Sequence, residues 1–217
     1  MYTKRNQRRA AQLTGISLLL MAVIAGGIMT EIYAPIFNSG RADFIVHFEE
    51  SNTRLIIGLF GWILILLCDI QVSCGLYVVY RTKNQRRAFL MGALRLIYST
   101  ILMIAIVQLI RAYFFSSDAE ESYELILSFR SSWLFGLIIF GVHLVYLSTL
   151  VWNEQLVPKV ISGALFMAGI GYIVSNVLNL IIVDYEQLRS QVEAVFILPM
   201  IVGELGLAIW LLVKGGK

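Results

Sequence analysis

The sequence predicts an all-α fold, a polytopic membrane bundle of six transmembrane helices with both termini in the cytoplasm. Hydrophobic residues make up 59% of the chain and charged residues only 14%, and the mean hydropathy is +0.79, far from the balance of a soluble domain. Apolar runs near the roughly 20 residues that a helix needs to cross a bilayer cover residues 13–34, 55–80, 88–114, 133–152, 160–183 and 195–213. Such continuous runs argue against a β-barrel, whose strands alternate apolar and polar residues. We therefore expect residues 1–217 to form a single integral-membrane domain without a soluble catalytic module.

The first run follows four basic residues, as a signal peptide would. It is longer than the apolar core of a signal and no clear cleavage site follows it, so we expect a retained helix. Most lysines and arginines fall on the side of the two termini: Lys4, Arg5, Arg8, Arg9, Arg81, Lys83, Arg86, Arg87, Lys159, Lys214 and Lys217. The loops on the opposite side hold most of the loop acids and only four basic residues, Arg41, Arg54, Arg130 and Arg189. Among these loops, 35–54 is expected to be the longest irregular stretch. By the positive-inside rule both termini are cytoplasmic, and the net charge of +3 reflects topology and implies no nucleic-acid partner.

Asp69 in the second run and Arg95 in the third are predicted to pair inside the bilayer. A short basic loop joins their helices into an antiparallel hairpin, and the two residues lie about eleven and about eight positions from its cytoplasmic ends, a difference in depth of only ~5 Å. Helical spacing puts Ser73 on the Asp69 face and puts Tyr98 and Ser99 on the Arg95 face, where their hydroxyls could support the ion pair. A charge in hydrocarbon costs several kcal/mol unless it is partnered. The pair could fix which helices meet, or it could gate or orient a substrate.

His143 in the fourth run and Glu204 in the sixth are two further polar groups near mid-membrane. Neither has an obvious partner on its own helix, apart from Tyr146 after His143. We expect both side chains to face the bundle interior and each other, because an outward-facing group would have neither a partner nor water. In that position they could share a proton, or they could form a single hydrogen bond that holds two helices together.

A shallower polar group is expected towards the outside of the membrane. Its members lie at the ends of the first and third runs or on one face of the fifth: Glu31, Gln108, Arg111, Tyr172, Asn176 and Asn179. Within this group, Glu31 and Arg111 are a candidate ion pair at the interface. The four tryptophans, Trp62, Trp133, Trp152 and Trp210, are expected to form an aromatic belt near the span ends, and small residues such as Gly26, Gly141 and Gly203 are expected at close helix contacts.

The residues required for several kinds of membrane chemistry are missing from the sequence. Haem ligation by two histidines needs two in the membrane, and only His143 qualifies because His47 lies in a loop. Cys68 and Cys74 lie too far apart for a disulfide and have no nearby histidine. No HExxH, GxSxG or P-loop motif occurs. We therefore expect neither a metal nor a cofactor.

Several separated elements together resemble an uncharacterised bacterial family of six-helix integral-membrane proteins, a domain of unknown function. They are RAAQLTG at 9–15, Cys68-Asp69-Ile70, Arg95-Leu96, Gly141-Val142-His143-Leu144, Leu156-Val157-Pro158-Lys159, Gly171-Tyr172, and Gly203-Glu204-Leu205 followed by WLLVKG at 210–215. The chain departs from the family pattern at Ser175, where many relatives carry an acid. The resemblance implies that the four polar residues at depth belong to the family's own pattern, and it supplies no activity, substrate or cofactor.

Three functional hypotheses follow, in order of preference. The protein is an accessory or regulatory membrane component, a small transporter or permeation protein, or a membrane-embedded enzyme that modifies a lipid with His143 and Glu204 as acid and base. The expected partners are membrane lipids and, as an open alternative, another membrane protein or a second copy of the chain. The expected location is the bacterial inner (plasma) membrane, as a multi-pass protein.

Overall fold

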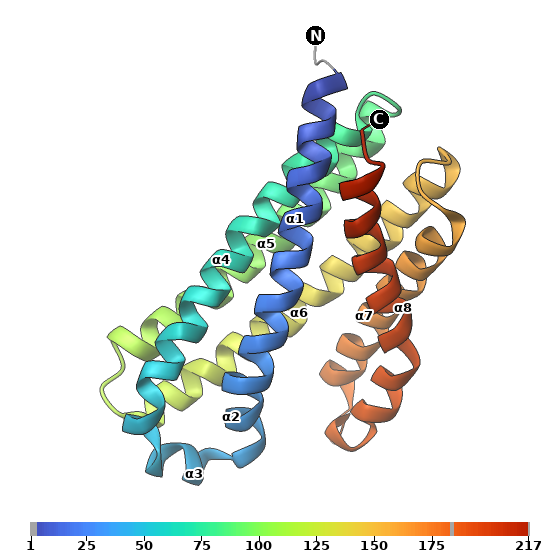
Figure 1. Cartoon of the computed structure of the whole chain (residues 1–217). Coiled ribbons are helices and arrows are strands. Elements are labelled where there is room, and N and C mark those ends of the chain that lie inside the picture. Colours follow the sequence, from blue (N-terminus) through green and yellow to red (C-terminus); the bar gives the residue numbers. More distant parts are fainter. Residues whose placement is uncertain (1–3, 183–184, 217) are drawn as a thin grey trace.

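The computed structural model describes residues 4–182 and 185–216, which are almost entirely helical and contain no strand (Figure 1). The elements are α1 (Lys4–Ile28), a π-helical turn η1 (Met29–Tyr33), α2 (Ala34–Ser39), α3 (Arg41–Val46), α4 (Phe48–Tyr80), α5 (Gln85–Phe114), α6 (Ala119–Asn153), α7 (Lys159–Ile181) and α8 (Tyr185–Val213). Within the described residues, six helices are long and apolar enough to cross a membrane, one for each predicted run. The predicted all-α fold with six spanning helices is confirmed.

Four helices begin well before the predicted apolar runs: α1 at Lys4, α4 at Phe48, α6 at Ala119 and α8 at Tyr185, where the runs start at 13, 55, 133 and 195. The stretch 35–54 is not irregular: it holds α2 and α3, separated by Gly40 with a φ of 80°, and the start of α4. Helix α6 begins at Ala119, well before the predicted start at 133. Asp118 caps it by accepting a hydrogen bond from the Glu121 amide at 2.8 Å, and the Glu121 carboxylate accepts one from the Ser117 amide at 2.8 Å. A hydropathy pattern misses these turns because a well-capped polar helix end carries no apolar signal.

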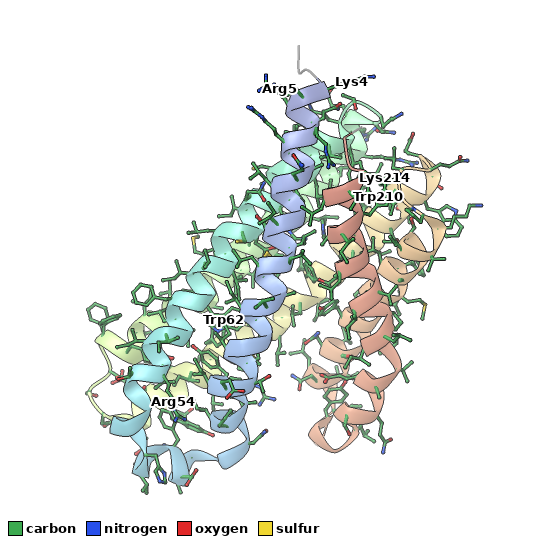
Figure 2. All side chains as sticks on the ribbon, viewed as in Figure 1. Lys4, Arg5, Arg54, Trp62, Trp210 and Lys214 are labelled. Atoms are coloured by element: carbon green, nitrogen blue, oxygen red, sulfur yellow. The ribbon has the colours of Figure 1, made fainter. Side chains whose placement is uncertain are left out.

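The six long helices form a closed ring of neighbours, in which α1 packs on α4, α4 on α5, α5 on α6, α6 on α7, α7 on α8, and α8 again on α1. The two termini lie at the same end, where α1 and α8 are close, and these two helices diverge towards the other end (Figure 1). Lys4, Arg5 and Lys214 cluster at the end of the termini, whereas Arg54 lies towards the opposite end (Figure 2). The side chain of Arg189 lies outside the described residues.

Contacts between α1 and α8 close the ring. The Arg8 guanidinium donates hydrogen bonds to the backbone oxygens of Leu211 (3.1 Å), Gly215 (2.8 Å) and Leu212, so it satisfies carbonyls that the end of a helix leaves without partners. About two helical turns after Arg8 on α1, a Cβ on Gly15 would lie 2.7 Å from the Ala208 carbonyl oxygen. Only glycine permits this approach of the two backbones.

The expectation about small residues is correct in part. Gly141 and Gly169 bring α6 and α7 together, because a Cβ on Gly141 would lie 2.7 Å from the Gly169 oxygen, and a Cβ on Gly203 would lie 2.8 Å from the Leu165 nitrogen. The expectation is wrong for Gly26, around which no atom lies within 4 Å of a built Cβ.

Trp62 does not belong to an aromatic belt at the membrane surface, contrary to the expectation. Its side chain is buried, with 1% exposure, and its ring centre lies 5.0 Å from those of both Phe129 and Trp133. Tyr33 joins the same group at 6.2 Å. This aromatic cluster packs α4 against α6, because large rings exclude water and pack efficiently edge to face. Trp152, by contrast, is 46% exposed.

Candidate functional site

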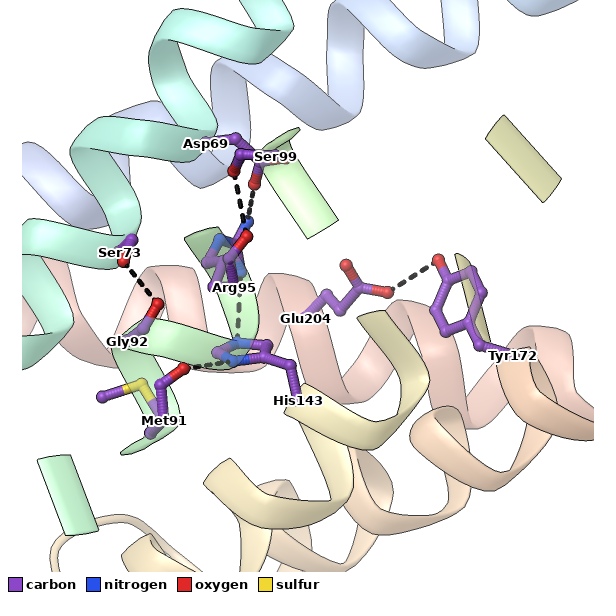
Figure 3. Close-up of polar contacts among 9 residues, drawn as sticks. All are labelled: Asp69, Ser73, Met91, Gly92, Arg95, Ser99, His143, Tyr172 and Glu204. Carbon is purple, nitrogen blue, oxygen red and sulfur yellow. Dashed lines mark hydrogen bonds and ion pairs between the residues drawn. The ribbon is translucent and has the colours of Figure 1, made fainter. Parts of the chain in front are cut away.

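Asp69 on α4 and Arg95 on α5 form the predicted ion pair. Asp69 Oδ1 lies 2.5 Å from Arg95 Nη2, and both residues are buried, with exposures of 0% and 1% (Figure 3). Burying two charges costs several kcal/mol each, and only a close, well-oriented partner offsets that cost. The two side chains meet because the short loop between α4 and α5 sets them at matching depth. With His143 they make up what we call the Arg95 cluster (Asp69, Arg95 and His143).

His143 on α6 extends this pair in one defined protonation state. Its Nδ1 lies 2.9 Å from the backbone oxygen of Met91, and its Nε2 lies 3.4 Å from Arg95 Nη1. A carbonyl can only accept and a guanidinium can only donate, so Nδ1 carries the proton and Nε2 accepts. A cationic imidazole would direct an N–H at the arginine. The contacts therefore favour neutral His143 with both ring nitrogens engaged.

The predicted hydroxyl support acts on the backbone and not on the ion pair. Ser73 Oγ donates to the Gly92 oxygen at 2.8 Å and ties α4 to α5, and Ser99 Oγ donates to the oxygen of Arg95 at 3.0 Å. The second carboxylate oxygen of Asp69 and Nε of Arg95 have no hydrogen-bond partner in the described part of the chain. The Arg95 cluster is thus packed tightly, although not every polar atom in it is satisfied.

Glu204 on α8 does not face His143, and this part of the prediction is wrong. Glu204 Oε1 accepts a hydrogen bond from the Tyr172 hydroxyl on α7 at 2.9 Å, whereas both nitrogens of His143 bind α5. Figure 3 shows the two groups with separate sets of partners. The physical reason is packing: α8 lies against α7 and α6 lies against α5. His143 is fully buried, and Glu204 is only partly buried.

The partial exposure of Glu204 arises because it lines a cavity of about 580 Å³ between α1, α4, α5, α6, α7 and α8. We call it the Glu204 cavity. Its polar wall combines Glu204 and Tyr172 with Ser175, Asn176 and Glu193. The rest is aromatic or aliphatic: Leu18, Met21, Ala22, Ala25, Trp62, Ile65, Tyr98, Trp133, Leu134, Leu137, Phe140, Ile197, Met200, Ile201 and Leu205. A concave apolar site with a few convergent polar groups is the usual form of a small-molecule site.

The cavity opens sideways, between α1 and α8. Two isoleucines of α8 that line it, Ile197 and Ile201, are 56% and 50% exposed. Ala22 on α1 lines it and is exposed as well. Because both helices are long and apolar enough to span a membrane, a molecule dissolved in the bilayer would meet this opening directly.

Phe140 separates the cavity from the Arg95 cluster. Its ring centre lies 5.2 Å from the Arg95 guanidinium carbon, 5.9 Å from the His143 ring and 5.2 Å from the Tyr172 ring. The same residue lines the cavity. The two polar regions are therefore neighbours that share one aromatic side chain, and neither Asp69 nor His143 lines the cavity.

The predicted outer polar group does not act as one unit. Arg111 donates a hydrogen bond to Gln108 at 3.1 Å, and no ion pair among the described residues joins it to Glu31, which is exposed. Asn176 donates to the Tyr172 backbone oxygen at 2.8 Å, so these two residues belong to the Glu204 cavity instead. Asn179, one turn further along α7, is half-buried and is not among the residues that line the cavity.

Sequence reasoning did not assign Tyr98, Phe140 or Ser175 to a cavity: it placed Tyr98 on the Arg95 face, named Ser175 only as a departure from the family pattern, and did not single out Phe140. Ser175 is 6% exposed and its hydroxyl has no hydrogen-bond partner in the described part of the chain. Its position three residues after Tyr172 on the same helix face was an available signal. In the described ranges, no group of three or more His, Cys, Asp and Glu side chains is arranged to hold a metal ion.

Comparisons with known proteins identify a family and a relative without supplying an activity. The family described as "Domain of unknown function (DUF4386)" matches residues 13–215. An uncharacterized protein of Archaeoglobus fulgidus is 29% identical to the chain over 163 residues, which cover 75% of this chain and 84% of that protein. No solved structure matches.

Proposed function

The chain belongs to the DUF4386 family, and we propose that it is an accessory or regulatory component of the cell membrane that binds a small amphipathic molecule in the Glu204 cavity. The distribution of lysine and arginine supports cytoplasmic termini. The expected setting is the bacterial plasma membrane, which the chain would cross six times.

The Glu204 cavity is the observation that carries the proposal. Its volume of about 580 Å³ falls within the range of ligand sites, roughly 300–1,000 Å³. Most of its wall is apolar, which suits the body of a lipid-soluble molecule, and the pair of Glu204 and Tyr172 can orient one polar group. The exposed lining residues on α1 and α8 indicate a route by which a molecule in the bilayer could enter the cavity between these two helices.

The geometry disfavours the enzyme hypothesis in the form that used His143 and Glu204. A general base must reach the proton that it removes, directly or through one water. His143 has one nitrogen on the Met91 oxygen and the other at Arg95, and it does not line the cavity. Glu204 has Tyr172 as its partner. The two groups are therefore not arranged as an acid and base on one substrate.

Transport is the second candidate, because each helix at the opening carries an irregularity. Helix α1 passes into the π-helical turn Met29–Tyr33, and α8 contains Pro199, which lacks the amide that would bond to the carbonyl of Val195. Transporters often place their binding sites where a membrane helix departs from regular geometry, and π turns often occur at functional sites. Movement of α8 about Pro199 would widen or narrow the opening.

Photolabelling tests the proposed site. We suggest 4-(hydroxymethyl)benzophenone, a neutral probe with one hydrogen-bonding end, on the protein purified in a neutral detergent. Saturable adducts are expected on Met21 and Met200, which line the cavity from α1 and α8. Ala22→Trp fills the opening and should abolish these adducts. Val23→Trp, at a position that is 74% exposed and does not line the cavity, is the matched control and should retain them.

Adducts that do not saturate, or that persist in Ala22→Trp at the level of the control, would refute binding in the cavity. For the transport alternative, reconstituted vesicles loaded with the quaternary trimethylammonium derivative of the probe, whose fixed charge keeps it from crossing lipid unaided, should lose it faster than protein-free vesicles. The Pro199→Ala variant should slow that release without changing the photolabelling.

A further inference from the structure

The described part of the Glu204 cavity wall contains acidic side chains and no basic ones. Among the described residues that line it, two are acids, Glu193 and Glu204, and none is lysine, arginine or histidine. Five aromatic rings face the same space, from Trp62, Tyr98, Trp133, Phe140 and Tyr172. Ring faces carry partial negative charge and attract cations. Both components of the wall therefore favour a ligand of positive charge.

The Glu204 carboxylate has binding capacity left for a ligand. The Tyr172 hydroxyl donates to Oε1 at 2.9 Å, which is the one hydrogen bond that the described part of the chain gives to this carboxylate. No ion pair between described residues involves Glu204. A carboxylate has about four lone-pair sites, so Oε2 can receive an N–H donor or lie beside an onium group.

Arg95, on the other side of Phe140, does not supply the missing positive charge. Its guanidinium lies 2.5 Å from Asp69 and is directed at Asp69 and His143. Phe140 stands between Arg95 and Tyr172, with contacts of 5.2 Å to each. Because Asp69 balances the charge of Arg95 within the Arg95 cluster, Glu204 remains without a counter-ion in a largely apolar cavity.

Anionic, neutral and cationic ligands differ in how they would interact with the Glu204 carboxylate. An anionic head group would lie beside a like charge in a site of low dielectric, where repulsion is strong. A neutral ligand would leave the Glu204 carboxyl with a single hydrogen bond in an apolar site, where it either stays a costly unpaired charge or takes up a proton and so loses its own charge. A cation on an apolar body satisfies the carboxylate, the ring faces and the aliphatic wall at once.

We infer that the molecule bound by the Glu204 cavity is a lipophilic organic cation, an amine or onium group on an apolar body, with Glu204 as its counter-ion and the surrounding aromatic rings as its cage. The inference rests on the proposed function, since it names the ligand class of the same cavity. Ser175 adds a buried hydroxyl without a hydrogen-bond partner in the described part of the chain, on the same wall as Glu204. It can accept an N–H of a protonated amine.

Competition against the neutral photolabel tests the charge. The competitors are tetraphenylphosphonium and tetraphenylborate, which carry four phenyl groups each and opposite charges, in a neutral detergent. Tetraphenylphosphonium should reduce labelling at a concentration at least about tenfold lower than tetraphenylborate, as expected for one additional charge contact. Glu204→Gln should remove most of this preference, and Glu31→Gln, which removes an exposed acid outside the cavity, should leave it unchanged.

The outcomes separate the two proposals. If the neutral probe labels the wild-type cavity and the anion competes as well as the cation, the ligand class is wrong and the binding site stands. A preference that survives in Glu204→Gln would equally overturn the role of this carboxylate. Labelling of Glu204→Gln by the neutral probe shows that the variant still folds with an intact cavity. The comparison of the two competitors in the wild type decides the charge of the preferred ligand without any variant. Failure of the neutral probe to label the wild type would refute the proposed function.

Discussion

Replacing Asp69 with asparagine should destabilise the protein by far more than loss of one hydrogen bond would. Asparagine keeps the shape and an acceptor oxygen, so the substitution removes mainly the charge. Arg95 is then left as an uncompensated cation, 1% exposed, whose contacts besides the neutral amide oxygen are His143 at 3.4 Å and the ring of Phe140 at 5.2 Å. Breaking a buried ion pair in this way typically costs about 3–5 kcal/mol.

A double-mutant cycle with Arg95→Gln measures the pairing itself. Removing Arg95 after Asp69→Asn also removes the uncompensated charge, so the double variant should recover part of the loss. We expect a coupling energy of at least about 2 kcal/mol. Hydrogen bonds between membrane helices average about 0.6 kcal/mol and reach about 1.7, so the expected coupling exceeds what a simple hydrogen bond would supply.

Tryptophan fluorescence during titration of detergent micelles with dodecyl sulfate provides the assay, because the rings of Trp62 and Trp133 pack 5.0 Å apart in the folded state. The matched control is the cycle of Arg41→Gln and Glu120→Gln, an ion pair whose side chains are 48% and 61% exposed. Exposed pairs contribute about 0–1 kcal/mol. Additive effects of the two buried substitutions, or a coupling no larger than that of the control, would refute a stabilising charge pair.

Two further predictions follow from the packing and the topology. Gly15→Ala should destabilise the bundle by about 1–3 kcal/mol through overpacking, because its Cβ would lie 2.7 Å from a backbone oxygen of α8, whereas Gly26→Ala, with open space around it, should be neutral or slightly stabilising in the same unfolding assay. In a background without the two native cysteines, a membrane-impermeant maleimide applied to intact cells should label Glu121→Cys and not Lys83→Cys. The reverse labelling would exclude cytoplasmic termini.

The depth of a polar residue in the membrane could be predicted from the sequence, and its direction around the helix axis could not. Depth follows from counting residues to the nearest loop at a fixed rise, and this placed Asp69 and Arg95 at the same level. Direction depends on which helices touch and at what rotation. For α6 that rotation is set by the contact of Gly141 with Gly169 on α7, and a single sequence does not report which glycine meets which.

The error over His143 and Glu204 follows from this limit. Both residues have suitable depth, but consecutive helices are usually neighbours in space. Helix α6 lies against α5 and helix α8 against α7, so His143 meets Arg95 and Glu204 meets Tyr172. A rule that first searches the preceding helix for a partner would have found both contacts.

The location of the cavity also depends on features outside any single helix. Its opening requires α1 and α8 to touch near the termini, where Gly15 and Arg8 hold them together, and to diverge further along. Neither residue carries an intramembrane charge, so neither drew attention in a search for polar groups at depth. A glycine within an apolar run is the sequence feature that marks a close helix contact at Gly15. Gly26 in the same run has this feature and makes no such contact.

The pairing of Asp69 with Arg95 matters for the chemistry of Glu204 as well as for packing. If Arg95 lacked its own carboxylate, its uncompensated charge on the other side of Phe140 would oppose the binding of a cation beside Glu204. With Asp69 at 2.5 Å, the Arg95 cluster is close to neutral and fully buried, so it can support the aromatic wall without competing for the ligand. One carboxylate thus serves the fold, and the second is left available to bind what enters between α1 and α8.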